Sequence, residues 1–149
     1  MLSFIKKIFR VPTADWPRSV PDGVLGELRL ADDADRWKGG TTVGDRTIGF
    51  MIGGKAKPDA RLIAHAHDIT QSLPAFEKSV AAFLADEARS RRDLAQFADE
   101  IRQLTIEEVC LFWPDRPDDG MIYFNGPNEI RVWRCDYVAR KPRRLGFDS

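Results

Sequence analysis

The segment RWKGGTTVGDRTIGFMIG, residues 36–53, decides the fold. Its halves, RWKGGTTV and RTIGFMIG, have the composition of strands, and the turn dipeptide Gly44-Asp45 separates them. Upstream, VLGELRL at residues 24–30 alternates between two faces, one of which suits contact with water, before the polar ADDAD. We expect these three segments to form an antiparallel meander.

Helical spacing follows the meander. Pro58 and Asp59 precede a segment whose apolar stripe consists of Leu62, Ile63, Ala66 and Ile69. Pro74 fits the first turn of a second helix, with an apolar stripe of Phe76, Val80, Phe83 and Leu84. Ser90 and Asp93 resemble a capping box, after which the stripe resumes at Leu94, Phe97, Ala98 and Ile101. Residues 74–103 therefore form either one long helix or two.

Strand patterns return after Leu104 in TIEEVCLFW, MIYF and EIRVWRCDYV, and NGPN joins the last two. The order of strands, helices and strands predicts an α+β fold. We expect a largely antiparallel sheet with two or three central helices packed on one face. Residues 23–149 form the predicted single domain, and residues 1–22 an amphipathic helix with a proline-rich lead-in.

Composition is that of a globular chain. Of 149 residues, 43% are apolar and 31% charged. A chain of this length and composition can bury a hydrophobic core without the help of disulfides or metal ions. Cys110 and Cys135 lie far apart in apolar stretches, so we expect reduced core thiols and no disulfide. The N-terminus lacks the apolar run of a signal peptide, and no run of about 20 residues could span a membrane. A cytoplasmic location is the expectation.

Charge is unevenly distributed. The chain has 23 basic and 23 acidic residues, but residues 1–20 and 131–149 are basic while the middle is acidic. This asymmetry prepares a surface for a charged partner, although solvated termini explain it equally well. Residues 1–10 have the spacing of a short amphipathic helix, which docks on the domain or contacts a partner or membrane surface. Pro12, Pro17 and Pro21 are expected to keep the next stretch irregular.

The two histidines of the chain lie in LIAHAHDIT, residues 62–70. On a helix that turns about 100° per residue, His65 and His67 point about 160° apart, on opposite flanks of the apolar stripe. Two ligands on one helix need a spacing of three or four residues to share a metal ion, so we predict no metal site. One histidine acting as a general base with a carboxylate from elsewhere in the fold remains open.

Other chemical motifs are incomplete. The GGTTVG of residues 39–44 has the outline of a phosphate loop, but Asp45 and Arg46 stand where Lys and Ser or Thr are needed. No GxSxG is present, and strand-like surroundings make a nucleophilic cysteine unfavourable. Adjacent Glu107 and Glu108 should point to opposite faces of a strand, and PDRPDDG has the composition of a solvated acidic loop. We predict no catalytic residue and no cofactor.

The last predicted strand, EIRVWRCDYV, is mixed on both faces, because aromatic residues alternate with arginines and a basic segment follows. Trp, Tyr and Arg are common in protein interfaces, and the same residues could stack on and neutralise nucleic acid. In the alternative, helices cover the aromatic face and the arginines pair with acids such as Asp136. The predicted protein-binding residues are Arg131, Trp133, Arg134 and Tyr137, with the loop residues Asp118 and Asp119.

The pattern LGELRL, RWKGG and TIGFMI, followed by a helical block and closing strands, resembles small bacterial domains found among immunity proteins of toxin systems. The matching residues are Leu25, Gly26, Leu28, Leu30, Trp37 and Gly39. The resemblance implies a non-enzymatic protein that binds or neutralises another protein. A protein-binding module using the C-terminal strands is therefore the leading hypothesis. The alternatives are a small hydrolase-like enzyme using His65 or His67, and nucleic-acid binding through the basic C-terminal segment.

Overall fold

The fold is given by a computed structural model that describes residues 15–31 and 35–149. Eight strands form one sheet, in which they lie in the same order as in the chain. Neighbouring strands are antiparallel except at the centre, where β4 and β5 are parallel. The strands are β1 Ser19–Asp22, β2 Gly26–Leu30, β3 Arg36–Val43, β4 Arg46–Gly53, β5 Thr105–Leu111, β6 Gly120–Asn125, β7 Val132–Val138 and β8 Lys141–Asp148. The predicted α+β class is confirmed.

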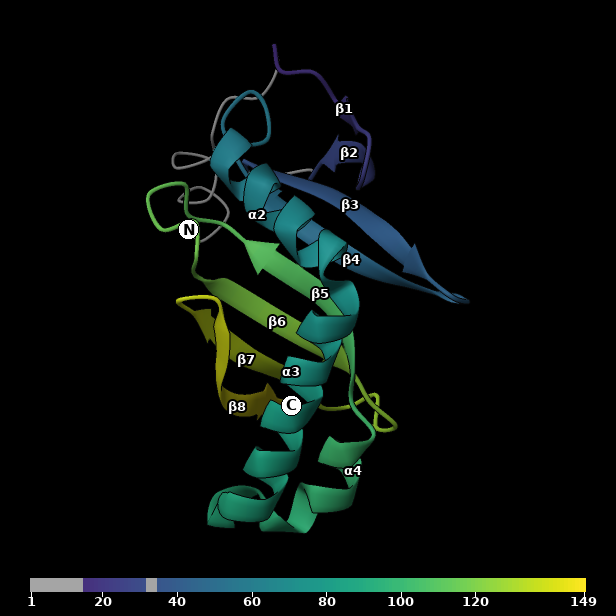
Figure 1. Cartoon of the computed structure of the whole chain (residues 1–149), viewed down its shortest axis with the longest axis vertical. Helices are drawn as coiled ribbons and strands as arrows, with labels where there is room; N and C mark the ends of the chain where they lie inside the picture. The colour runs from purple at the N-terminus through teal and green to yellow at the C-terminus, as the bar shows by residue number, and fades with distance from the viewer. Residues whose placement is uncertain (1–14, 32–34) are drawn as a thin grey trace, which may run out of the picture.

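The helices lie between β4 and β5 in the chain and cover one face of the sheet (Figure 1). They are α2 Ala60–Gln71, α3 Leu73–Ser90, a 3₁₀ helix at Arg92–Phe97, and α4 Ala98–Arg102. Asp59 caps α2 by accepting hydrogen bonds from the backbone N–H groups of Arg61 and Leu62, and Pro74 lies in the first turn of α3, as predicted. Arg91, with φ −88° and ψ 107°, is extended, so residues 74–103 do not form one helix.

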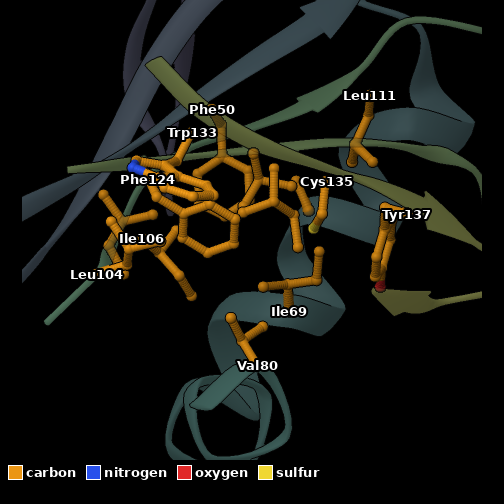
Figure 2. Close-up of a cluster of buried hydrophobic side chains, with 14 of the residues drawn as sticks. Phe50, Ile69, Val80, Leu104, Ile106, Leu111, Phe124, Trp133, Cys135 and Tyr137 are labelled. Atoms are coloured by element: carbon orange, nitrogen blue, oxygen red, sulfur yellow. The ribbon is translucent and has the colours of Figure 1, made fainter. Parts of the chain in front are cut away.

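The core lies between the sheet and the helices. Figure 2 shows side chains of the strands, among them Phe50, Phe124 and Trp133, gathered on the same side of the sheet as Ile69 and Val80 of the helices. Alternation along β7 turns Trp133, Cys135 and Tyr137 inward, each at most 2% exposed. Burying one such large side chain contributes about 1.5–3 kcal/mol. Both cysteines are buried free thiols, as predicted, but only Cys135 belongs to this core, and Cys110 lies on the opposite side of the sheet.

Two predictions about local structure are wrong. Pro21, expected in irregular chain, belongs to β1 and pairs with Glu27 of β2. A proline is tolerated there because β1 is an edge strand, where a missing N–H leaves no ladder bond unmade. The basic C-terminal segment, for which the sequence predicted no strand, forms the edge strand β8.

The β7–β8 hairpin explains why β8 was missed. Its turn residues Ala139 and Arg140 have φ of 51° and 64°, values that a sequence usually signals with Asn or Gly. Here acidic side chains hold the turn instead. Asp119 Oδ1 accepts from the Ala139 N–H at 2.9 Å, and Asp118 Oδ1 accepts from Arg140 Nε at 2.7 Å.

The amphipathic helix predicted at residues 1–10 lies outside the described residues. Within the part that is described, no helix combines the length and apolar character needed to cross a bilayer.

Close backbone approach at the start of β6 gives a test of this packing. A Cβ at Gly120 would lie 2.1 Å from the carbonyl oxygen of Cys110 in β5, whereas a Cβ at Gly146 in β8 meets nothing within 4 Å. We expect Gly120→Ala to lower the free energy of unfolding by about 1–3 kcal/mol, and Gly146→Ala to change it by less than about 0.5 kcal/mol. Urea denaturation of both variants measures this; equal effects would contradict the β5–β6 register.

Candidate functional site on the open face of the sheet

His65 lies in the core, which the predicted flanking position did not anticipate. Its side chain is buried between α2, β7 and the loop before β6, and the residue is 2% exposed. The Nδ1–H donates to the carbonyl oxygen of Pro117, since a carbonyl can only accept. Nε2 then accepts from the hydroxyl of Tyr137 at 3.0 Å. Both ring nitrogens are therefore occupied within the fold.

Burial sets the protonation state of this pair. Burial lowers the pKa of His65, and the nearby charge of Arg140 lowers it further. The Pro117 carbonyl and the carboxylates of Asp118 and Asp68 act in the opposite direction. Burial also raises the pKa of Tyr137 to about 12. A neutral histidine without contact to solvent ties the loop to α2, and this arrangement does not support its use as a general base.

His67 is more accessible but is also engaged. Its Nε2 lies 2.9 Å and 3.0 Å from the two carboxylate oxygens of Asp22, the last residue of β1. Asp22 also accepts from the backbone N–H groups of Val24 and Leu25, and these bonds together with His67 lower its pKa against the opposing effect of burial. The pair therefore anchors the β1–β2 turn to α2.

The predicted protein-binding residues are dispersed by the fold. Trp133 and Tyr137 are 0% and 2% exposed and face the helices. Arg131 contacts Glu100 of α4 through two hydrogen bonds of 2.8 Å and 2.9 Å, and its guanidinium lies 4.7 Å from the centre of the Phe97 ring. This is the arrangement in which helices cover the aromatic side of the strand, so neither aromatic residue offers area to a partner.

The other three predicted residues remain at the surface. Arg134 points away from the helices and pairs with Asp148 of β8 at 3.0 Å. Asp118 and Asp119 hold the β7–β8 turn, so the loop expected to be merely solvated has a structural role.

The side of the sheet opposite the helices forms a second surface, which we call the open face. It is turned away from the viewer in Figure 1, and the described helices leave it uncovered. Directly paired residues place two rows of side chains across it. One row consists of Lys38, Met51, Cys110, Met121 and Asp136, and the other of Gly40, Gly49, Glu108, Tyr123 and Arg134.

A β-bulge in β5 changes the expected direction of its carboxylates. The register with β6 shifts between Ile106 and Glu108, which leaves Glu107 without a partner. Ile106 and Val109 on either side of the two glutamates are buried, whereas Glu107 is exposed, Glu108 is partly exposed, and both line the same hollow on the open face. The prediction that the two glutamates point to opposite faces is therefore wrong. Bulges insert one extra residue and redirect the side chains around it.

The hollow has a volume of ≈ 410 Å³ and lies over β3, β4 and β5. Gly40 and Gly49 pair directly across β3 and β4, so neither strand raises a side chain at this point. Glu108 lies along Gly49, since a Cβ added to Gly49 would be 3.3 Å from Glu108 Oε2. The lining residues are Lys38, Gly39, Thr47, Gly49, Glu107, Glu108 and Tyr123. We call this space the glycine hollow.

The hollow carries more negative than positive charge. Lys38 Nζ lies 3.9 Å from Glu108 Oε2, but the lysine side chain is 65% exposed, so this ion pair is weak. The Cys110 thiol donates to Glu108 Oε1 at 3.5 Å, and burial together with this carboxylate raises the pKa of Cys110. No lysine or arginine of residues 15–31 and 35–149 lies within 4 Å of the Glu107 carboxylate.

The sequence held part of the signal for this hollow. A tight turn at Gly44-Asp45 determines the register of β3 and β4, and that register places Gly40 opposite Gly49. Neither the bulge nor the position of Tyr123 could be derived in this way, because both depend on pairing between β5 and β6.

Across the described residues, no group of three or more His, Cys, Asp or Glu side chains is arranged to hold a metal ion. No protein-family model, curated protein or solved structure matches this chain.

Neutral, buried His65 makes stability depend on pH. Because its pKa is lowered in the fold, the unfolded chain binds more protons near pH 6.5, so stability falls as the pH decreases through that value. We expect the free energy of unfolding to decrease between about pH 7.5 and 5.5. His65→Gln should flatten this slope, and His67→Gln on the same helix should retain it. Urea denaturation at a series of pH values measures both.

A second measurement uses the native protein, so it does not require the His65 variant to fold. The NMR signals of the His65 ring should stay constant through pH 6.5 in the native protein. Titration of that ring with an ordinary histidine midpoint would contradict the assignment of its two hydrogen bonds.

Proposed function

We propose that this chain is a protein-binding module that contacts its partner through the open face of the sheet. The proposal rests on one observation: the described helices all cover the same face of the sheet, and they leave the open face uncovered. On the open face, partly exposed Met51, Met121 and Tyr123 lie among charged side chains. Methionine, tyrosine and arginine are enriched in protein interfaces, and apolar side chains in such a setting mark interaction surfaces.

The dimensions of the open face suit an ordinary interface. Strands about 4.8 Å apart make eight strands roughly 34 Å wide, and strands of four to eight residues are roughly 13–26 Å long. The resulting area is comparable with the roughly 800 Å² that one partner buries in a standard complex. A partner protein can therefore bind here without any rearrangement of the core.

Charge favours a protein over nucleic acid. The open face is crossed by Glu107, Glu108 and Asp136, which repel phosphates. Two cations of the C-terminal segment are neutralised within the fold, since Arg134 pairs with Asp148 and Arg140 with Asp118. A protein surface with charges of both signs complements such a face better than a uniformly anionic backbone does.

The resemblance to immunity proteins supports one kind of partner, a toxin encoded beside this chain. The residues that carry it, such as Leu28 and Trp37, are fully buried and belong to the framework of the sheet. The resemblance therefore concerns the scaffold, and the open face is where the partner would be selected.

Site-specific photo-crosslinking in cells of the native host tests the proposal. A benzoylphenylalanine at position 143, whose residue pairs with Asp136 and is exposed, samples the open face. The same cross-linker at position 78, exposed on α3, samples the helical face. We expect a discrete adduct from position 143 and none of the same mass from position 78.

Charge reversal supplies the matched control. Asp136→Arg on the open face should lower the yield of the adduct severalfold, because it places a like charge against the complementary partner surface. Asp86→Arg on the exposed side of α3 should leave the yield unchanged. Equal yields of the adduct from positions 143 and 78, or a yield that neither charge reversal changes, would refute the open face as the binding surface.

A further inference from the structure

We propose that the glycine hollow is the site in the open face that receives a positively charged side chain, lysine or arginine, of the partner protein. This inference rests on the proposed function and adds the chemistry of the partner. It begins from the bulge at Glu107, which places two neighbouring carboxylates at one opening. A regular strand would have separated them onto opposite faces.

Space for a long side chain comes from the facing glycines. Gly49 lines the hollow without a side chain of its own, and it pairs across the strands with Gly40. The volume of ≈ 410 Å³ lies within the usual size range of ligand clefts. A lysine or arginine stem is apolar and can lie in this space while its charged group reaches the carboxylates. Tyr123 lines the same hollow and provides an aromatic ring, which attracts a cation placed over its face.

Charge balance selects a cation over an anion or a neutral group. Two carboxylates face one lysine, and that lysine is mostly exposed and 3.9 Å from its partner. The nearest arginine of the same row, Arg134, is already bound to Asp148. A cation from the partner can therefore displace Lys38 into solvent at small cost and pair with both carboxylates.

Partial burial makes the pairing stronger than an ordinary surface contact. The side chain of Glu108 is 20% exposed and lies between Gly49 and the Cys110 thiol. Charges that are partly shielded from water interact more strongly than fully solvated ones, and hydrogen bonds to a carboxylate are about twice as strong as neutral ones. The opposing explanation is that the two glutamates only keep the open face soluble, and it predicts no saturable binding.

The test is an NMR titration of the full chain with a minimal probe, Nα-acetyl-arginine N-methylamide. Its neutral, isosteric citrulline analogue is the control for the apolar stem, and the lysine amide compares the two cations. We expect saturable shifts at the amides of Gly49, Glu108 and Tyr123, with a dissociation constant on the order of 1 mM for the arginine probe. The citrulline probe should bind at least about fivefold more weakly.

Isosteric variants locate the charge. Glu107→Gln and Glu108→Gln should each weaken binding of the arginine probe by about three- to tenfold. Lys38→Met should strengthen it, because this variant removes the competing cation. Asp136→Asn removes one negative charge from the same face outside the hollow and should leave the dissociation constant within about twofold.

The outcomes separate this inference from the proposed function. Equal binding of the arginine and citrulline probes, no saturable shift, or a loss in Asp136→Asn equal to that in Glu107→Gln would overturn the cation site. If that occurs while the cross-linked adduct still forms at position 143, the binding module stands without this contact. Probe binding with the expected variant pattern, but without an adduct, would retain the hollow and remove the open-face interface.

Discussion

The parallel pairing of β4 with β5 is the constraint on which the rest of the structure depends. Two parallel neighbours cannot be joined by a hairpin, so the chain must leave the sheet and return along the same direction. The helical block from Ala60 to Arg102 makes this crossing, and its apolar stripes cover one face. All other strand pairs are antiparallel and need only short connections. The same constraint therefore builds the core and leaves the opposite face open.

Strand periodicity divides the two faces, and the bulge in β5 alters that division. In β7 the period of two holds throughout, so Trp133, Cys135 and Tyr137 enter the core while Arg134 and Asp136 face outward. In β5 the extra residue Glu107 breaks the period and brings two carboxylates together beside Gly49. The extra residue interrupts the hydrogen bonding between β5 and β6 at one position. It also produces the glycine hollow, the part of the open face with the clearest chemical preference.

Polar side chains attach the peripheral segments to this framework. His65 holds the loop before β6, Asp22 and His67 hold the β1–β2 turn, and Asp118 holds the β7–β8 turn. Glu100 accepts hydrogen bonds from both Arg131 and the indole of Trp133, which fastens α4 to the last hairpin. Each contact joins residues distant in the chain, and each buried polar group among them has a partner. Residues that suggested catalysis or binding in the sequence are therefore used mainly to position the fold.

Local pattern in the sequence determined the class of the fold, the β3–β4 hairpin and the cap of α2 at Asp59, because these depend on neighbours within a few residues. The facing pair Gly40 and Gly49 also follows from the turn at Gly44. Only the tertiary structure decided the burial of His65, the existence of β8 and the common direction of Glu107 and Glu108. The burial of His65 depends on a tyrosine 72 residues away, and β8 depends on acidic side chains about 20 residues before its turn. The direction of the two glutamates depends on a register shift against β6. Contacts at such separations leave no period in the sequence, since they arise only when the sheet has assembled.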